Sequence, residues 1–119
     1  MIGSFSVVAN DRAKREVALM IKSVRQFYDC PVFVMCDQAT QLFLSKLVLG
    51  DVRCILGLEP DRLATKEGLV SHVVKENDFH SASIILTKMD VIEEAVEQCG
   101  DTLFLDADIV LLQNLDKDI

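Results

Sequence analysis

The stretch that determines the fold runs from residue 4 to residue 36 and reads SFSVVANDRAKREVALMIKSVRQFYDCPVFVMC. Residues 4–9 are a short apolar run rich in β-forming residues, which predicts a buried strand. From Val17 onward, apolar residues recur at every third or fourth position, the spacing of one helical face. Pro31 ends this helix, and the apolar run over 32–36 predicts a second strand.

The rest of the chain continues the same alternation. The predicted elements are a helix over 39–49, a strand over 52–56, a loop over 57–80, a helix over 82–99 and a strand over 102–106. Gly50 and Gly100 are placed to end the two helices. The last strand is apolar on both faces, which predicts a central place in its sheet. Alternating strands and helices predict an α/β fold, a mostly parallel sheet with flanking helices, in a single domain over 1–119.

The composition restricts the class of partner. The 119 residues carry a formal net charge of −7 and no run of Lys or Arg, which argues against nucleic acid as a main partner. The N-terminus has no signal-peptide pattern, and the apolar runs are too short to span a membrane. The four cysteines show no C-x-x-C spacing and lie in or beside apolar segments, so we expect reduced, buried thiols in a cytoplasmic protein. They are Cys30, Cys36, Cys54 and Cys99.

In parallel sheets covered by helices, ligands bind outside the carboxyl ends of the strands. The polar residues at these positions are therefore the candidates for a binding site. Asn10 and Asp11 follow the first strand, where a nucleotide base or ribose would lie, although either could equally cap the next helix. Asp37 follows the second strand and is a weaker candidate for a ligand contact.

Two carboxylates one residue apart, Asp106 and Asp108, come at the end of the last predicted strand. Like charges so close repel one another, and a hard divalent cation such as Mg²⁺ or Mn²⁺ would relieve the repulsion. A pair of solvated turn aspartates is the alternative, because Asp is common after strands. The apolar residues on both sides of the motif favour the metal site over an exposed turn.

Lys88 stands out on a helical wheel of residues 82–99 because it is the one charged residue within the apolar arc. That arc contains Met89, whereas Thr87 falls on the opposite, polar arc. A lysine there could reach the strand ends beside Asp106 to bind a diphosphate, or it could extend along the edge of the arc to solvent. His72 and His80 have no matching partners for a metal site or a catalytic triad.

These segments resemble glycogenin-like glycosyltransferases and related nucleotide-diphospho-sugar transferases of the GT-A fold. The resemblance is carried by VVAND (7–11), LTKMDVIEEA (86–95) and TLFLDADIVLLQNL (102–115). It implies the Rossmann-like, nucleotide-binding half of that fold, a donor that is a UDP-sugar, and an acceptor hydroxyl on a sugar or protein.

The resemblance also assigns roles to single residues. Asp106 and Asp108, with Ala107 between them, match the Asp-x-Asp motif that binds Mn²⁺ and, through it, the diphosphate. Lys88 matches a helix lysine that approaches the nucleotide sugar. Ala9 and Asn10 match strand-end positions that contact the nucleoside.

The sequence departs from the family at two places. Ala13 stands near the position where an aromatic residue often stacks on the base, which puts the preference for uracil in doubt. The acceptor-binding strands and a further histidine ligand, which follow the Asp-x-Asp motif in the family, are not part of this sequence. We therefore expect a truncated or unusually short form of the family, whose exposed apolar surface favours homo-oligomers.

Two alternative functions remain open. Haloacid-dehalogenase-like phosphatases also carry Asp-x-Asp after an apolar strand, but their motif lies near the N-terminus and continues with a hydroxyl residue. Here Ile109 and Val110 follow instead. The other alternative is an α/β module that binds a metal or a partner without catalysis.

Overall fold

The computed structural model describes residues 1–58 and 79–118 and confirms an α/β fold. Its elements are β1 (Ser4–Ala9), the 3₁₀ turn η1 (Asp11–Ala13), α1 (Lys14–Arg25), β2 (Val32–Cys36), α2 (Gln38–Ser45), β3 (Val52–Leu56), α4 (Phe79–Cys99), β4 (Thr102–Phe104) and η3 (Leu115–Asp118). The described strands form one sheet in the order β3-β2-β1-β4, and every pairing between them is parallel.

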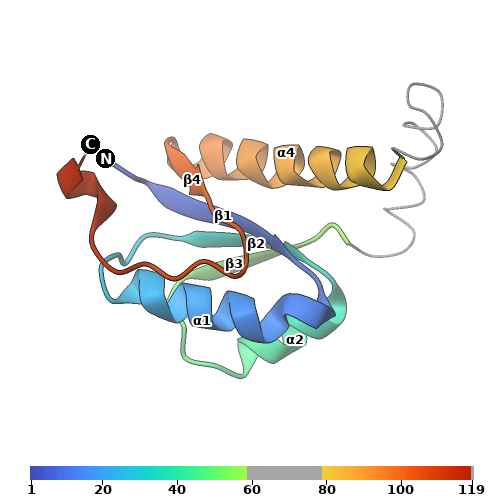
Figure 1. The fold of residues 1–119 in the computed structure, drawn as a ribbon, viewed down its shortest axis with the longest axis horizontal. Helices are drawn as coiled ribbons and strands as arrows, with labels where there is room; N and C mark the ends of the chain where they lie inside the picture. Colours follow the sequence, from blue (N-terminus) through green and yellow to red (C-terminus); the bar gives the residue numbers. More distant parts are fainter. Residues whose placement is uncertain (59–78, 119) are drawn as a thin grey trace.

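Helices cover both faces of this sheet. Figure 1 shows α1 and α2 on one face and α4 on the other. Successive side chains of β1 alternate between the two layers, as the pleat of a strand requires. Phe5 and Val7 pack in the core on the α1 side, whereas Val8 contacts the core beneath α4.

The first three strands have the predicted bounds, but the prediction for the last strand is wrong in two respects. β4 ends at Phe104 rather than at Asp106, and in the described sheet it lies at the edge rather than at the centre. Its side chains contact apolar residues on both faces because the layers above and below cover it. Leu103 packs against the core on the α1 side and Phe104 against the core beneath α4.

The helix ends agree only in part with the sequence. α2 ends at Ser45 instead of residue 49, and α4 begins at Phe79, inside the predicted loop over 57–80. The remainder of that predicted loop, residues 59–78, lies outside the described residues. Gly100 ends α4 as predicted, with a φ of 75°. Among the described helices, none is both long enough and apolar enough to cross a membrane.

The segment after β4 crosses to the α1 face and ends near the N-terminus (Figure 1). The backbone N–H of Leu111 donates to the Ser23 hydroxyl at 2.9 Å, and the Leu111 side chain is buried. Further along, the Tyr28 hydroxyl donates to Asn114 Oδ1 at 2.9 Å. The same hydroxyl accepts from the backbone N–H groups of Leu115 and Asp116 at 2.8 and 3.0 Å. Ser23 of α1 and Tyr28, three residues beyond its end, thus hold the chain that follows the Asp-x-Asp motif.

The Arg25 side chain joins α1 to the loop before β3. Its guanidinium donates to the carbonyls of Leu49, Cys30 and Asp51 at 2.6–2.7 Å. Gly50, with a φ of 74°, lets the loop pass close to this side chain. A Cβ atom at Gly50 would stand 2.6 Å from Arg25 Nε.

Alanine at the two left-handed glycines tests this contact. Gly100→Ala is expected to cost about 1–2 kcal/mol, the penalty of a left-handed L-residue, since an added Cβ meets nothing within 4 Å. Gly50→Ala should cost about 1 kcal/mol more, because the guanidinium must give up hydrogen bonds to carbonyls that are partly buried. Urea denaturation of both variants measures the difference. Equal losses would show that the Arg25 contact contributes nothing.

Candidate functional site

The Asp-x-Asp motif forms an exposed turn beside the edge strand. The backbone N–H of Leu105, one residue beyond β4, donates to the Ser6 carbonyl of β1 at 2.9 Å. The Asp106 carbonyl then accepts from the Ile109 N–H at 3.1 Å and closes a four-residue turn. The side chains of Asp106 and Asp108 are exposed, and Ala107 is half-buried.

This geometry corrects one step of the sequence argument. The apolar residues that frame the motif favour a metal site over an exposed turn, yet 56 % of Val110 is exposed and Ile109 is exposed as well. Only Leu105 and Leu111 are buried. The frame therefore anchors the turn at its two ends and leaves both carboxylates in solvent.

The turn lies where the order of the strands reverses. From β1 the chain adds β2 and then β3 on one side, and it returns to place β4 on the other side. In open α/β sheets, ligands bind in the crevice at such a reversal, outside the carboxyl ends of the strands. Asn10, directly after β1, and Asp106, two residues after β4, flank this reversal.

The described contacts of Asn10 and Asp11 are structural. The side chain of Asn10 caps η1 by accepting from the Arg12 N–H at 3.0 Å. The Asp11 carboxylate pairs with Lys14 Nζ at 2.9 Å. Both residues are exposed, whereas Ala9, the last residue of β1, is almost completely buried. A nucleoside contact at these three positions stays a prediction.

Asp37 joins two loops at the carboxyl edge of the sheet. Its carboxylate caps α2 by accepting from the Thr40 N–H at 2.9 Å and from the Thr40 hydroxyl. It also accepts from the Asp11 N–H at 3.0 Å. Partial burial acts to raise the pKa of Asp37, but these hydrogen bonds outweigh it and the pKa lies below its ordinary value. These bonds give Asp37 a structural role, and a ligand contact stays a prediction.

Lys88 lies next to β4. Its side chain is half-buried, and its ammonium stands 5.5 Å from the centroid of the Phe104 ring. Phe104 is the last residue of β4, two positions before Asp106. No ion pair joins Lys88 to Asp106 or Asp108 in the described part of the chain.

The buried face of α4 differs from the predicted arc. Thr87 was placed on the polar side but is 1 % exposed, whereas Met89, placed on the apolar side, is 59 % exposed. In the part of α4 whose side chains are described, the buried residues are Thr87, Val91 and Ala95, at intervals of four. Apolar residues occur all around this helix, so their mean direction is a poor guide to its buried side. Lys88 lies beside this face, which agrees with a lysine extended along an apolar surface.

The donor set fits a cation that is shared with a ligand. Among the residues that the structure describes, no three His, Cys, Asp or Glu side chains gather closely enough to hold a metal by themselves. Mg²⁺ in proteins commonly takes one or two carboxylates together with waters and substrate phosphates. The two exposed carboxylates of Asp106 and Asp108 meet that requirement.

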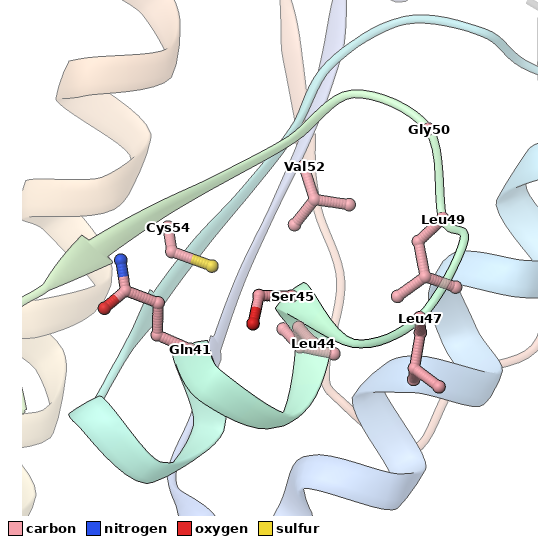
Figure 2. Close-up of a pocket in the computed structure, with 8 residues that line it drawn as sticks. All are labelled: Gln41, Leu44, Ser45, Leu47, Leu49, Gly50, Val52 and Cys54. Carbon is pink, nitrogen blue, oxygen red and sulfur yellow. The ribbon is translucent and has the colours of Figure 1, made fainter.

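A hollow lies elsewhere, between α2 and β3 (Figure 2). It is half open and encloses about 290 Å³. Its lining residues are Gln41, Leu44, Ser45, Leu47, Leu49, Gly50, Val52 and Cys54. No sequence motif indicates this hollow, because its residues come together only through the packing of α2 on the edge strand.

Comparison with known proteins gives no independent assignment. No protein-family model matches the chain, and no curated protein matches it significantly. The candidate site therefore depends on the arrangement of Asp106, Asp108 and Lys88 around the end of β4.

The structural role of Asp37 can be tested by titration. Because the folded-state pKa lies below the unfolded value of about 3.8, the stability that the carboxylate contributes is complete above that value. It is lost as the pH falls through the folded-state pKa. Asp37→Asn keeps a capping oxygen but loses the charge, so it should lower the free energy of unfolding by about 1 kcal/mol at pH 7 and by progressively less below about pH 4.

Denaturation with urea between pH 7 and pH 2.5 measures both quantities. Asp101→Asn is the matched control, because it removes one exposed carboxylate just before β4. Its free energy of unfolding should follow that of the parent chain. A difference between Asp37→Asn and the parent that does not change with pH would contradict the proposed role of the carboxylate.

Proposed function

We propose that this chain binds the donor of a glycosyltransferase, a nucleotide-diphospho-sugar, at the Asp106–Asp108 turn together with Mn²⁺ or Mg²⁺. The observation that carries the proposal is the position of two exposed carboxylates in one turn, directly after β4 and beside the reversal of strand order. The Rossmann-like and GT-A character of the chain belongs to the same proposal.

Charge explains why a cation belongs in this site. The chain has a formal net charge of −7. Neither Asp106 nor Asp108 takes part in an ion pair in the described part of the chain, so the turn presents two negative charges. A diphosphate would be repelled by such a surface. A divalent cation held by Asp106 and Asp108 supplies the positive charge that the diphosphate needs.

Lys88 supplies a second positive charge from the neighbouring helix. Its ammonium stands 5.5 Å from the centroid of the Phe104 ring, at the last residue of β4. In the proposed complex a change of rotamer would bring this ammonium to the diphosphate at the turn. During transfer, a positive charge there stabilises the nucleoside diphosphate as it departs, while an acceptor hydroxyl attacks the anomeric carbon.

The loop after β1 completes the proposed site. Ala9, Asn10 and Asp11 lie on the other side of the strand-order reversal from Asp106. The exposed side chains of Asn10 and Asp11 offer hydrogen-bonding groups to a ribose or base, next to the buried Ala9 at the end of β1. The nucleoside would therefore lie over β1, the diphosphate at the turn and the sugar beyond it.

Metal-dependent binding of UDP tests the proposal. Asp106→Asn and Asp108→Asn remove a negative charge each and should weaken UDP binding in Mn²⁺ by at least about tenfold, because hydrogen bonds and ligation by charged groups contribute roughly 1.5–3 kcal/mol. Isothermal titration with UDP, UDP-glucose and UDP-galactose, in Mn²⁺ and then in EDTA, measures the effect. Asp101→Asn removes an exposed carboxylate at the opposite, amino-terminal end of β4, and this variant should bind as the parent chain does.

Two results would contradict the proposal. One is binding of UDP that is equally tight in EDTA. The other is equal affinity in the parent chain and in both turn variants. A phosphate trapped covalently on Asp106 after incubation with a phosphomonoester would instead support the phosphatase alternative.

Lys88→Met removes the ammonium and keeps an apolar stem of similar length. We expect UDP binding in Mn²⁺ to weaken about tenfold, while the loss of the contact with Phe104 costs only about 0.5–1 kcal/mol of stability. Lys22→Met, on the exposed side of α1, is the matched control. If both variants bind UDP with the affinity of the parent chain, Lys88 has no part in the site.

A further inference from the structure

Two thiols lie side by side on neighbouring strands, away from the Asp-x-Asp turn. Cys54 of β3 is paired with Val34 of β2, and Cys36 of β2 is paired with Leu56. Cys36 and Cys54 are therefore diagonal neighbours on the same face of the sheet, the face covered by α1 and α2. The Cys36 thiol is hydrogen-bonded to the Cys54 sulfur.

Only one of the two sulfurs is open to small molecules. Cys36 is fully buried, whereas Cys54 is partly exposed and lines the hollow between α2 and β3. Figure 2 shows its sulfur pointing into this hollow, with the Gln41 amide and the Ser45 hydroxyl on the α2 side. The hollow, at about 290 Å³, has room for a small reagent.

The surroundings of Cys54 also favour its thiolate. The hydrogen bond from Cys36 lowers the pKa of Cys54 and outweighs the opposing effect of burial. Burial raises the pKa of Cys30, which lies near the end of α1 and lacks such a thiol donor among its described contacts. Thiolates, rather than thiols, are the nucleophiles in cysteine chemistry, so access and protonation state favour the same residue.

We propose that Cys54 is a site of oxidation by small uncharged peroxides that enter through the hollow, and that Cys36 is its positioning hydrogen-bond donor. The Cys54 sulfur attacks one oxygen of the peroxide and the O–O bond breaks. Sulfur keeps that oxygen as a sulfenic acid, and the leaving hydroxide takes a proton to become water. With hydrogen peroxide the products are one sulfenic acid and one water.

Cys36 is poorly placed to close a disulfide with the oxidised Cys54. Neighbouring strands lie about 4.8 Å apart and two residues rise about 6.6 Å, so the two Cα atoms are separated by roughly 8 Å. Disulfides rarely form when this separation exceeds about 7 Å, unless the backbone moves. The sulfenic acid therefore persists until a small-molecule thiol displaces its hydroxyl, forming a mixed disulfide and water.

Trapping the sulfenic acid tests the proposal directly. The full chain is treated with a limiting amount of hydrogen peroxide in the presence of dimedone, and each of the four cysteines is then assayed by peptide mass spectrometry. We expect dimedone on Cys54 severalfold faster than on Cys30 or Cys99. Cys54→Ser should abolish that label, and Cys36→Ala should slow it severalfold, whereas Cys36→Ser keeps a donor and restores the rate.

Before peroxide is added, each variant must show the circular dichroism spectrum of the parent chain. A loss of dimedone label then results from the changed thiol chemistry and not from unfolding. Faster labelling of Cys30 or Cys99 than of Cys54 would overturn the proposal. An unchanged labelling rate of Cys54 in Cys36→Ala would contradict the positioning role of Cys36. A Cys36–Cys54 disulfide as the main product would contradict the proposed fate of the sulfenic acid.

Discussion

The pairing of β1 with a parallel strand on each side is the constraint on which the rest of the structure depends. β1 pairs with β2 through five residues and with β4 through three. Its side chains supply both cores, because alternate residues face α1 and α4. The order of the strands reverses at this strand, and the two loops of the proposed site follow from that reversal. A single buried strand thus determines both the packing and the position of the site.

The segment after β4 depends on this arrangement as well. β4 makes only a short ladder, and the chain then leaves the sheet through the Asp106–Ile109 turn. Ser23 and Tyr28 of the α1 region hold the residues that follow. The turn is therefore anchored on one side by the sheet and on the other by the α1 face. Two carboxylates in such a turn are held in place without being buried, a condition that suits a cation shared with a diphosphate.

Sequence reasoning predicted the strands and the parallel character of the sheet because these follow from local patterns. The segments 4–9, 32–36 and 52–56 are short and rich in β-forming residues, and a segment with helical spacing of apolar residues separates the first two. The place of β4 could not be predicted in this way. A strand covered on both faces by other layers has the same apolar pattern as a strand flanked by other strands.

Ambiguities of the same kind affected the site. Asn and Asp after a strand serve equally well as helix caps and as ligand contacts, and Asn10 and Asp37 have the capping bonds. On α4, apolar residues on several sides hid the burial of Thr87. The contact between Cys36 and Cys54 depends on the register of β2 against β3, which a single sequence does not contain.

The most direct test of the central claim is to locate the cation itself. In the presence of UDP, a substoichiometric amount of Mn²⁺ broadens the amide signals of nearby residues in an ¹⁵N NMR spectrum of the chain. The account predicts the strongest broadening at residues 105–110, and its loss in Asp108→Asn. Broadening centred on another acidic surface, such as the exposed Glu93 and Glu97 of α4, with the turn unaffected, would contradict it.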